Sequence, residues 1–359
     1  MEGKMKAQVF YEANKMQLEE VDIPKINDCE VLIKVKSCGI CGSDISYYYG
    51  HSPLDTENGK GPLVLGHEFC GDIVEIGDEV KRLGLFKSGD RVTCNPVQPC
   101  NSCVHCKKGK FNLCKQSRVL GVSVDGAFAE YVKADYTNVL KLGDSVPYEY
   151  GALTEPLACA ATGVMDLGIE IGDTVAIVGP GAIGLMMVQL AKACGAGQVI
   201  LIGIFDYPLQ VGLQCGADVV LNSADYHSPY YCEDVPAKIA ELTGGVKAQK
   251  VIVPTSAMPA LQSAMDISAE GSTIIYFGLP GEKDLLQVPV LDTLKSSKTI
   301  KFSWLTGQIW PNVINALDTG MIDLSLLITH RFSLEEAAQG IEFMHVSPED
   351  KIKGVVNIG

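Results

Sequence analysis

Four cysteines lie close together in the sequence and form its clearest metal-binding pattern. They follow the spacing Cys-x2-Cys-x2-Cys-x7-Cys, at Cys100, Cys103, Cys106 and Cys114. Zinc binds four thiolates tetrahedrally, and such a closed set leaves no position for a substrate. The spacing therefore predicts a structural zinc site, which can contribute about 10 kcal/mol of local folding free energy. The competing interpretation is that these cysteines are free or paired in disulfides. The odd total of 13 cysteines and the absence of a recognisable secretion signal disfavour a disulfide framework.

Three further motifs supply residue types that bind a catalytic zinc ion. They contain Cys41, the pair His67 and Glu68, and Glu155. A catalytic zinc takes about three protein ligands and keeps one position open for water or substrate, and mixed sulfur, nitrogen and oxygen donors suit it. Taken alone, His67 would more often be a structural histidine and Cys41 a small buried apolar residue. Their position ahead of a dinucleotide-binding motif favours the metal interpretation.

A glycine-rich turn predicts that the chain binds a dinucleotide. Residues 179–184 fit the pattern G-x-G-x-x-G, directly after an apolar run and at the start of a helical pattern that includes Ile183. Gly179 permits the tight turn, Gly181 lets the backbone approach the pyrophosphate, and Gly184 lets helix and strand pack closely. The N-terminus of the helix then faces the phosphates. A glycine turn in a flavodoxin-like sheet without a nucleotide is the alternative.

The second strand of this unit departs from the usual nucleotide-binding pattern. An acidic residue about 20 positions past the turn normally binds the ribose 2′-hydroxyl, but Gly203 stands there. A glycine lacks the carboxylate that would repel a 2′-phosphate, yet no Arg or Lys occurs between Gly203 and Cys215 to hold one. Asp206 follows as a candidate ribose ligand. The sequence leaves the choice between NAD and NADP open.

The patterns around these motifs predict an α/β protein of two domains. A chain of 359 residues is long enough for about two domains. Residues 1–150 are rich in short strands and turns, which predicts an irregular β domain that includes the cysteine lobe at about 94–116. From 151 to 290, buried strand-like runs alternate with helical patterns. This alternation predicts a doubly wound parallel sheet with helices on both faces.

The last segment, residues 291–359, is again mixed. Ser333 and Glu336 form the sequence signature of a capping box, which predicts a helix over about 334–344. An apolar run over 354–358 predicts a final strand.

Composition excludes several classes of protein. Hydrophobic residues make up 47% of the chain, which excludes large-scale disorder. The formal net charge of −14 repels phosphate backbones and anionic membranes. Lysines near the cysteine lobe fit a nucleic-acid-binding zinc ribbon, but the negative net charge of the chain argues against such a function. No signal peptide or membrane helix is recognisable, so we expect a cytoplasmic protein without nucleic-acid or membrane partners.

Together these motifs resemble the zinc-dependent medium-chain dehydrogenase/reductase family over nearly the whole chain. Its motifs occur in the family's order: Cys-Gly-Ser-Asp at 41–44, Gly-His-Glu at 66–68, the four-cysteine lobe, Gly-Ala-Phe-Ala-Glu-Tyr at 126–131, Glu-Pro-Leu at 155–157 and the glycine turn. Glu-Pro-Leu is similar to the polyol (sorbitol-like) and threonine dehydrogenase branches, in which glutamate replaces a cysteine of other alcohol dehydrogenases. The resemblance implies a GroES-like catalytic domain, a Rossmann domain, a C-terminal segment that returns to the catalytic domain, and a homodimer or homotetramer.

The resemblance also implies a role for each residue of the catalytic zinc site. Cys41 and His67 are zinc ligands, and Glu68 and Glu155 bind the ion directly or through its water. Which of the two carboxylates is the direct ligand stays open.

Proton transfer is implied for Ser43, whose hydroxyl stands beside the substrate alcohol, while Asp44 orients the ligating histidine. The family often has a histidine two residues after this aspartate, and the chain has Ser46 there. Proton exit then runs through water or another group.

Two aromatic residues are candidate substrate contacts. Tyr47 follows the Cys41 motif, and Trp304 follows Ser303 in a pair that is more like galactitol-phosphate-type dehydrogenases than sorbitol enzymes. Packing in the core is the alternative for both.

The implied reaction is reversible oxidation of a secondary alcohol in a polyol or sugar alcohol, with or without a phosphate, to a ketone. One catalytic and one structural zinc per chain are expected, with NAD or NADP as hydride acceptor. Threonine or butanediol dehydrogenation on the same fold is the nearest alternative. Two further alternatives are a zinc-free enzyme similar to quinone reductases and a noncatalytic nucleotide-binding protein that zinc stabilises. Neither explains the presence of the candidate ligands of the catalytic zinc.

Overall fold

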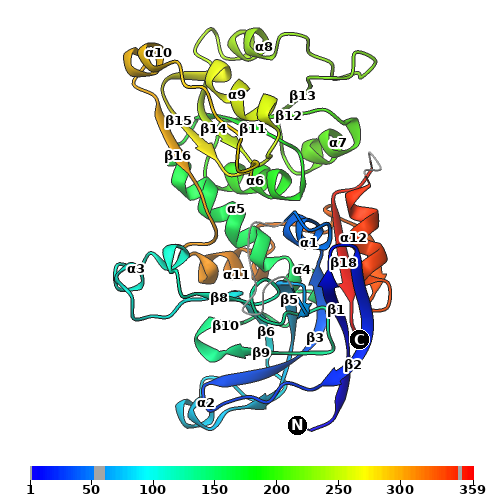
Figure 1. The fold of residues 1–359 in the computed structure, drawn as a ribbon. Coiled ribbons are helices and arrows are strands. Elements are labelled where there is room, and N and C mark those ends of the chain that lie inside the picture. Colours follow the sequence, from blue (N-terminus) through cyan, green and yellow to red (C-terminus); the bar gives the residue numbers. More distant parts are fainter. Residues whose placement is uncertain (1, 52–60, 347–349) are drawn as a thin grey trace. The chain divides into compact units, whose positions relative to one another are not determined.

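The computed structural model describes residues 2–51, 61–346 and 350–359, and the chain forms two compact units (Figure 1). Unit 1 consists of residues 1–156, 307–320 and 328–359, and unit 2 of residues 157–306 and 321–327. The sequence predicts domain boundaries at 150 and 290, whereas the first segment of unit 1 ends at 156 and the first segment of unit 2 ends at 306. Unit 2 extends to 306 because the last strand of its sheet follows residue 290.

Unit 1 is built mainly of strands. Its largest sheet has the order β10-β6-β5-β3-β18-β17, with β9 also paired to β3, and smaller sheets have the orders β2-β1-β4 and β7-β8. The strands are β1 (Lys4–Glu12), β2 (Lys15–Asp22), β3 (Glu30–Gly39), β4 (Leu63–Val64), β5 (Glu68–Ile76), β6 (Arg91–Cys94), β7 (Val97–Gln98), β8 (Arg118–Val119), β9 (Tyr131–Asp135), β10 (Val139–Lys141), β17 (Ile328–Ser333) and β18 (Lys353–Asn357).

Short helices connect these strands. They are α1 (Gly42–Tyr48), α2 (Asp78–Leu83), α3 (Val104–Lys107), α4 (Tyr148–Ala152), α11 (Trp310–Asp318) and α12 (Ala337–His345), with 3-10 turns η1 (Phe111–Leu113) and η2 (Tyr136–Asn138). The predicted helix over about 334–344 begins later, at Ala337. The reason is local, since the Ser333 amide and hydroxyl both donate to the Glu336 carboxylate and close a turn ahead of the helix.

The final strand, β18, lies between β17, the strand that precedes it, and β3, which is far away in the sequence. It runs antiparallel to β3, with Val355 opposite Gly39, and parallel to β17. Val355 and Val356 are fully buried there. Because β3 leads directly to Cys41, the last strand of the chain borders the candidate metal site.

Unit 2 contains a six-stranded parallel sheet of order β13-β12-β11-β14-β15-β16 (Figure 1). Its elements are β11 (Thr174–Val178), α6 (Ala182–Ala193), β12 (Gln198–Gly203), α7 (Asp206–Gln214), β13 (Val219–Asn222), α8 (Val235–Leu242), β14 (Ala248–Val253), α9 (Met258–Ile267), β15 (Ser268–Tyr276), α10 (Val290–Lys295) and β16 (Thr299–Phe302), while α5 (Thr154–Leu167) leads into the unit. This strand order reverses direction at β11, which confirms the predicted Rossmann-type sheet and places its ligand crevice at the carboxyl ends of the strands.

The apolar runs that predicted the parallel strands are buried on both faces. Val175, Ala176 and Ile177 in β11 have no exposed surface, as expected for a strand between two helical layers. Among the described residues, no helix combines the length and the apolar character needed to span a membrane.

Candidate active site

Three predicted zinc ligands come together in unit 1. Cys41, His67 and Glu68 each offer one ligand atom, and these atoms all lie within 4.8 Å of one another. Cys41 is the N-cap of α1 directly after β3, and Glu68 begins β5, where it stands opposite Gly39 of β3. The antiparallel pairing of β3 with β5 therefore places the thiol beside the imidazole.

The turn before His67 requires a glycine. Gly66 has a φ of 91°, and a Cβ there would meet Cys38 Sγ at 2.9 Å and the Phe128 amide nitrogen at 3.0 Å. The close packing fixes the path of the backbone and so the direction in which His67 leaves it.

Asp44 ties the two ligand-bearing loops together. Its carboxylate accepts hydrogen bonds from the Cys41 amide at 2.9 Å and the Gly66 amide at 3.2 Å, and Oδ1 lies 3.6 Å from His67 Nδ1. Burial of the imidazole opposes protonation, but Asp44 and Cys41 outweigh it and raise the pKa of His67 well above its ordinary value. A carboxylate in this position orients a ligating histidine toward its metal, and the residues fit a zinc ion.

Lys353 is a member of the site that the sequence patterns did not reveal. Its ammonium lies 2.8 and 2.6 Å from the two Glu68 carboxylate oxygens and donates to the Ile40 carbonyl at 2.9 Å. Burial lowers the pKa of Lys353, but the Glu68 charge outweighs burial and raises it. The only local signal was a lysine at the start of an otherwise apolar strand.

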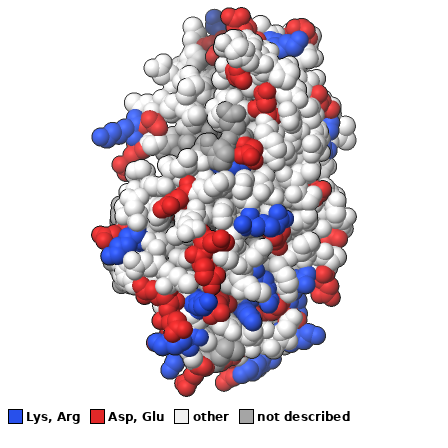
Figure 2. All heavy atoms as spheres, turned by 90° about the vertical axis from the view of Figure 1, so that its right-hand side faces the viewer, with Lys and Arg blue, Asp and Glu red and all other residues white. Residues whose placement is uncertain are grey.

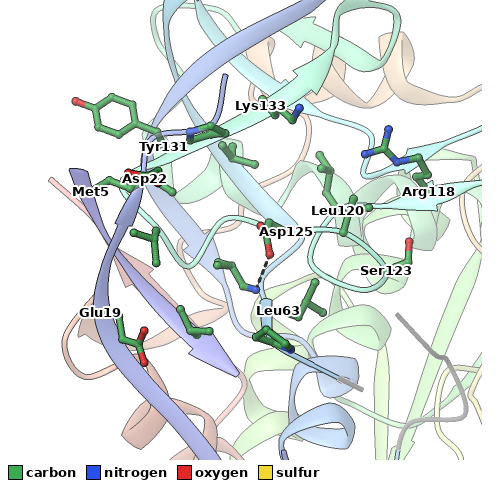
Figure 3. Close-up of a pocket in the computed structure, with 18 of the residues that line it drawn as sticks. Met5, Glu19, Asp22, Leu63, Arg118, Leu120, Ser123, Asp125, Tyr131 and Lys133 are labelled. Carbon is green, nitrogen blue, oxygen red and sulfur yellow. Dashed lines mark hydrogen bonds between the residues drawn. The ribbon is translucent and has the colours of Figure 1, made fainter. Parts of the chain in front are cut away.

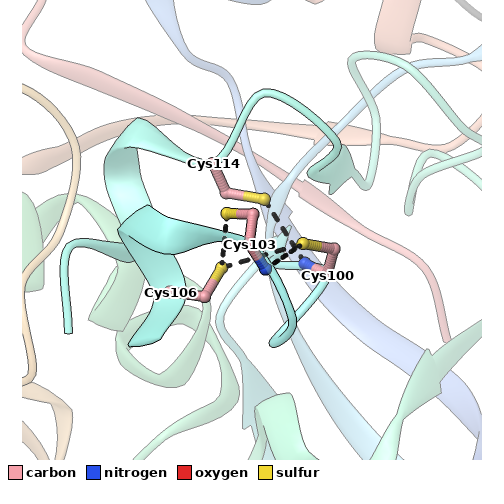
Figure 4. A group of neighbouring side chains, drawn as sticks. All are labelled: Cys100, Cys103, Cys106 and Cys114. Atoms are coloured by element: carbon pink, nitrogen blue, oxygen red, sulfur yellow. Dashed lines mark hydrogen bonds between the residues drawn. The ribbon is translucent and has the colours of Figure 1, made fainter. Parts of the chain in front are cut away.

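The four clustered cysteines also converge, and they come from a single loop (Figure 4). Their ligand atoms lie within 4.8 Å of one another, and Cys103 Sγ is 3.5 Å from Cys106 Sγ. Hydrogen bonds from Ser102 and Cys103 lower the pKa of Cys100 to about 6, whereas burial raises that of Cys106 to about 12. All four thiols are free, so the predicted tetrahedral zinc set has its donors in place.

The predicted dinucleotide turn joins β11 to α6 in unit 2. Gly179 has a φ of 122°, and a Cβ on Gly184 would collide with the Gly179 carbonyl. Gly181 is the N-cap of α6 and has no neighbour within 4 Å of its Cβ position, which leaves room for a phosphate. Ile183, in the first turn of α6, is partly buried. The three glycines fit the roles that the sequence predicts.

Comparisons with known proteins agree with this geometry. Residues 27–144 match the alcohol dehydrogenase GroES-like domain, and residues 182–319 match the zinc-binding dehydrogenase domain. An L-threonine 3-dehydrogenase of Bacillus licheniformis is 35% identical, with 96% of each chain covered. A sorbitol dehydrogenase of Bacillus subtilis is 33% identical, over 94% of this chain and 93% of its own. The chain belongs to the zinc-dependent medium-chain alcohol dehydrogenase family.

A solved structure extends the likeness to the whole fold of the dehydrogenase. It is a zinc-binding dehydrogenase from Sinorhizobium meliloti bound to NADP, with a TM-score of 0.91, 29% identity and 99% of each chain covered. The enzyme is thus an NAD(P)-dependent alcohol dehydrogenase, and zinc and a nicotinamide dinucleotide are its cofactors.

The predicted proton-relay residue of the dehydrogenase lies at the metal group. Ser43 is on α1, and its hydroxyl oxygen is 3.4 Å from His67 Nε2. Glu155, in the first turn of α5, is buried but is not among the three side chains that converge within 4.8 Å.

The two predicted substrate contacts have different surroundings. Tyr47 is 2% exposed, its hydroxyl donates to the Val122 carbonyl at 2.9 Å, and its ring packs edge-on against Phe10. This arrangement is typical of a core residue, so its contact with substrate stays a prediction. Trp304 follows β16 in unit 2 and is 39% exposed.

A separate pocket of about 510 Å³ lies in unit 1, and none of the metal-site residues lines it (Figure 3). Two of its carboxylates already bind the protein: Asp125 accepts from the Val64 amide at 3.0 Å, and Glu19 accepts from the Tyr11 hydroxyl at 2.8 Å.

One face of the protein shows how its charged side chains are distributed. On the face shown in Figure 2, acidic and basic side chains are interspersed without a continuous basic tract.

Proposed function

We propose that this enzyme reversibly oxidises a secondary alcohol of a polyol or sugar alcohol, with or without a phosphate, to a ketone by hydride transfer to NAD(P). The observation that carries the proposal is the group of Cys41 and His67 with the Ser43 hydroxyl 3.4 Å from the imidazole. The similarity to sorbitol dehydrogenase supports a polyol substrate. The similarity to threonine dehydrogenase makes the secondary alcohol of threonine the second candidate.

Different residues of the chain have different roles in the proposed mechanism. Cys41, His67 and a glutamate would hold the zinc ion, which would supply the Lewis acidity that lowers the pKa of an alcohol. Asp44 holds the two ligand loops in register through the Cys41 and Gly66 amides. Ser43 would relay the hydroxyl proton, accepting it while its own hydroxyl proton passes on to water, and NAD(P) would serve as the hydride acceptor that turns the alcohol into a ketone.

We assign the direct carboxylate ligand to Glu155 and an auxiliary role to Glu68. The charge of Glu68 is already balanced by Lys353, which contacts both of its oxygens. Glu155 also stands where, by the resemblance to the polyol and threonine branches, a glutamate replaces a cysteine of other alcohol dehydrogenases.

Self-association and location belong to the same proposal. We expect a homodimer or homotetramer, with a mass two or four times the 38.5 kDa of one chain. The support is that β16 is an edge strand and that large apolar side chains around it are exposed, namely Leu285, Val290, Leu291, Leu294 and Phe302. A cytoplasmic location is expected because the 13 cysteines are all free.

An absorbance assay of the nicotinamide tests the proposal directly. Purified enzyme is offered polyols, polyol phosphates, butanediol and threonine with NAD and with NADP, with and without a zinc chelator. Chelator-sensitive turnover that is fastest on a polyol supports it. Fastest turnover on threonine would replace the substrate class, and no turnover on any alcohol by enzyme that holds two zinc ions would contradict the assignment.

A further inference from the structure

The adenosine end of the nucleotide site lacks its usual carboxylate for a steric reason. Gly203 ends β12, where an acidic residue normally binds the ribose 2′-hydroxyl. A Cβ at this position would lie 2.5 Å from Pro180 Cγ and 2.8 Å from Pro180 Cδ. Pro180 belongs to the glycine turn, and its ring is rigid. The proline therefore occupies the space that a side chain at position 203 would need.

Asp206 supplies a carboxylate close by, and the structure holds it in place. It begins α7, and its Oδ1 accepts hydrogen bonds from Asn222 Nδ2 at 2.8 Å and from Ser228 Oγ at 2.6 Å. Asn222 and Ser228 are both buried, and Asn222 is itself fixed because its Oδ1 accepts from the Ala224 and Asp225 amides. The carboxylate is thus set in one orientation by the end of β13 and the loop that follows.

The second oxygen of this carboxylate remains available. Both hydrogen bonds to Asp206 end on Oδ1, and within the described residues none reaches Oδ2. The side chain is only partly buried. Asp206 can therefore accept a hydrogen bond from a hydroxyl group.

The charges of this region disfavour a phosphate. No Lys or Arg occurs from 193 to 237. The flanking lysines are already paired, Lys192 with Asp218 at 3.0 Å and Lys238 with Glu241 at 2.8 Å. A 2′-phosphate near Asp206 would meet a carboxylate and would lack the cation that NADP sites supply.

We infer that Asp206 takes the place of the absent acid at position 203 and makes the enzyme select NAD(H) over NADP(H). The inference rests on the proposed function only in that a nicotinamide dinucleotide is the hydride carrier. The Sinorhizobium relative holds NADP, so the preference follows from this chain's own residues rather than from membership of the family.

Binding of the two reduced dinucleotides tests the inference without any substrate. NADH and NADPH are titrated into the purified, zinc-loaded protein, and nicotinamide fluorescence gives each Kd. We expect NADH to bind at least about tenfold more tightly, the effect of one charge-assisted hydrogen bond. Asp206→Asn keeps an oxygen for Asn222 and Ser228 but removes the charge, and we expect it to reduce the preference about tenfold.

Asp225→Asn is the matched control, because Asp225 lies in the same loop and its Oδ1 accepts from the His227 amide. We expect this variant to keep the preference of the wild type. Equal or tighter binding of NADPH by the wild type, or an equal effect of both substitutions, would overturn the role of Asp206 and leave the dehydrogenase proposal standing. Failure of the wild type to bind either dinucleotide would instead overturn the proposed function.

Discussion

The Lys353 ammonium lies 2.6 Å from a carboxylate oxygen of Glu68, although 285 residues separate the two in sequence. Both side chains are almost fully buried. We expect Lys353→Met to lower the free energy of unfolding by about 3–5 kcal/mol, because it leaves a buried charge without its partner. Urea unfolding of the zinc-loaded protein measures the effect. The double variant Lys353→Met/Glu68→Gln should recover most of the loss, and a double variant no more stable than the single one would argue against charge pairing.

Loss of one of the predicted ligands of the catalytic zinc should stop catalysis without unfolding the chain. We expect Cys41→Ser and His67→Ala to lose measurable turnover and to hold one zinc per chain in place of two, since the four-cysteine lobe is untouched. Metal analysis and circular dichroism check both points. Cys29→Ser, at an exposed cysteine, serves as the control that keeps two zinc ions. Near-normal activity in Cys41→Ser would remove this residue from the zinc site.

The two candidate carboxylate ligands can be separated by conservative substitution. We expect Glu155→Gln to lose the catalytic zinc on dialysis, and Glu68→Gln to retain it with reduced turnover, because Glu68 is already engaged by Lys353. Zinc content after dialysis against a weak chelator is the measurement. The reverse pattern would make Glu68 the direct ligand.

The four-cysteine lobe should matter for stability and not for the chemical step. Cys106→Ser removes one of four thiolates from a closed site, so we expect one zinc per chain and a lower Tm. Hydride transfer in the folded fraction should persist. A variant that keeps two zinc ions and the Tm of the wild type would show that this cluster does not hold a metal.

Acid should weaken a contact that fastens the last strands of unit 1 to α4. Glu149 accepts hydrogen bonds from Arg331 at 2.8 Å and from Asn357 at 3.0 Å. Burial raises the pKa of Glu149, but these two partners outweigh burial and lower it below its ordinary 4.5. The stability from this carboxylate is therefore present above pH 4.5 and is lost as the pH falls through the lowered value.

The matching variant is Glu149→Gln. Because the pair is partly exposed, we expect it to cost about 0.5–1 kcal/mol at neutral pH. The difference from the wild type should disappear in acid, as urea unfolding over a pH series would show. If the stability difference between Glu149→Gln and the wild type did not change with pH, the ionised Glu149 carboxylate would not be the source of the stabilisation.

Sequence patterns predicted those parts of the site whose residues are close together in the sequence. They missed contacts between residues that only folding brings together. The cysteine spacing and the glycine turn each lie within one loop, so their residue types were sufficient. Lys353 was missed because its partner is on a distant strand, and a single lysine in an apolar run has no periodicity. The anchoring of Asp206 was likewise not predictable, since Asn222 and Ser228 reach it only after β12 and β13 pair.

The placement of β18 also bears on the order in which the enzyme is made. Unit 2 is almost entirely translated before residues 328–359 of unit 1 leave the ribosome. Until then Glu68 lacks its cation and β3 lacks one neighbouring strand. At about 5–20 residues per second, these last residues take a few seconds, during which the nucleotide-binding unit is complete and the metal-binding unit is unfinished. We therefore expect the dinucleotide fold to mature first, and the Lys353 contact beside the zinc centre to form last.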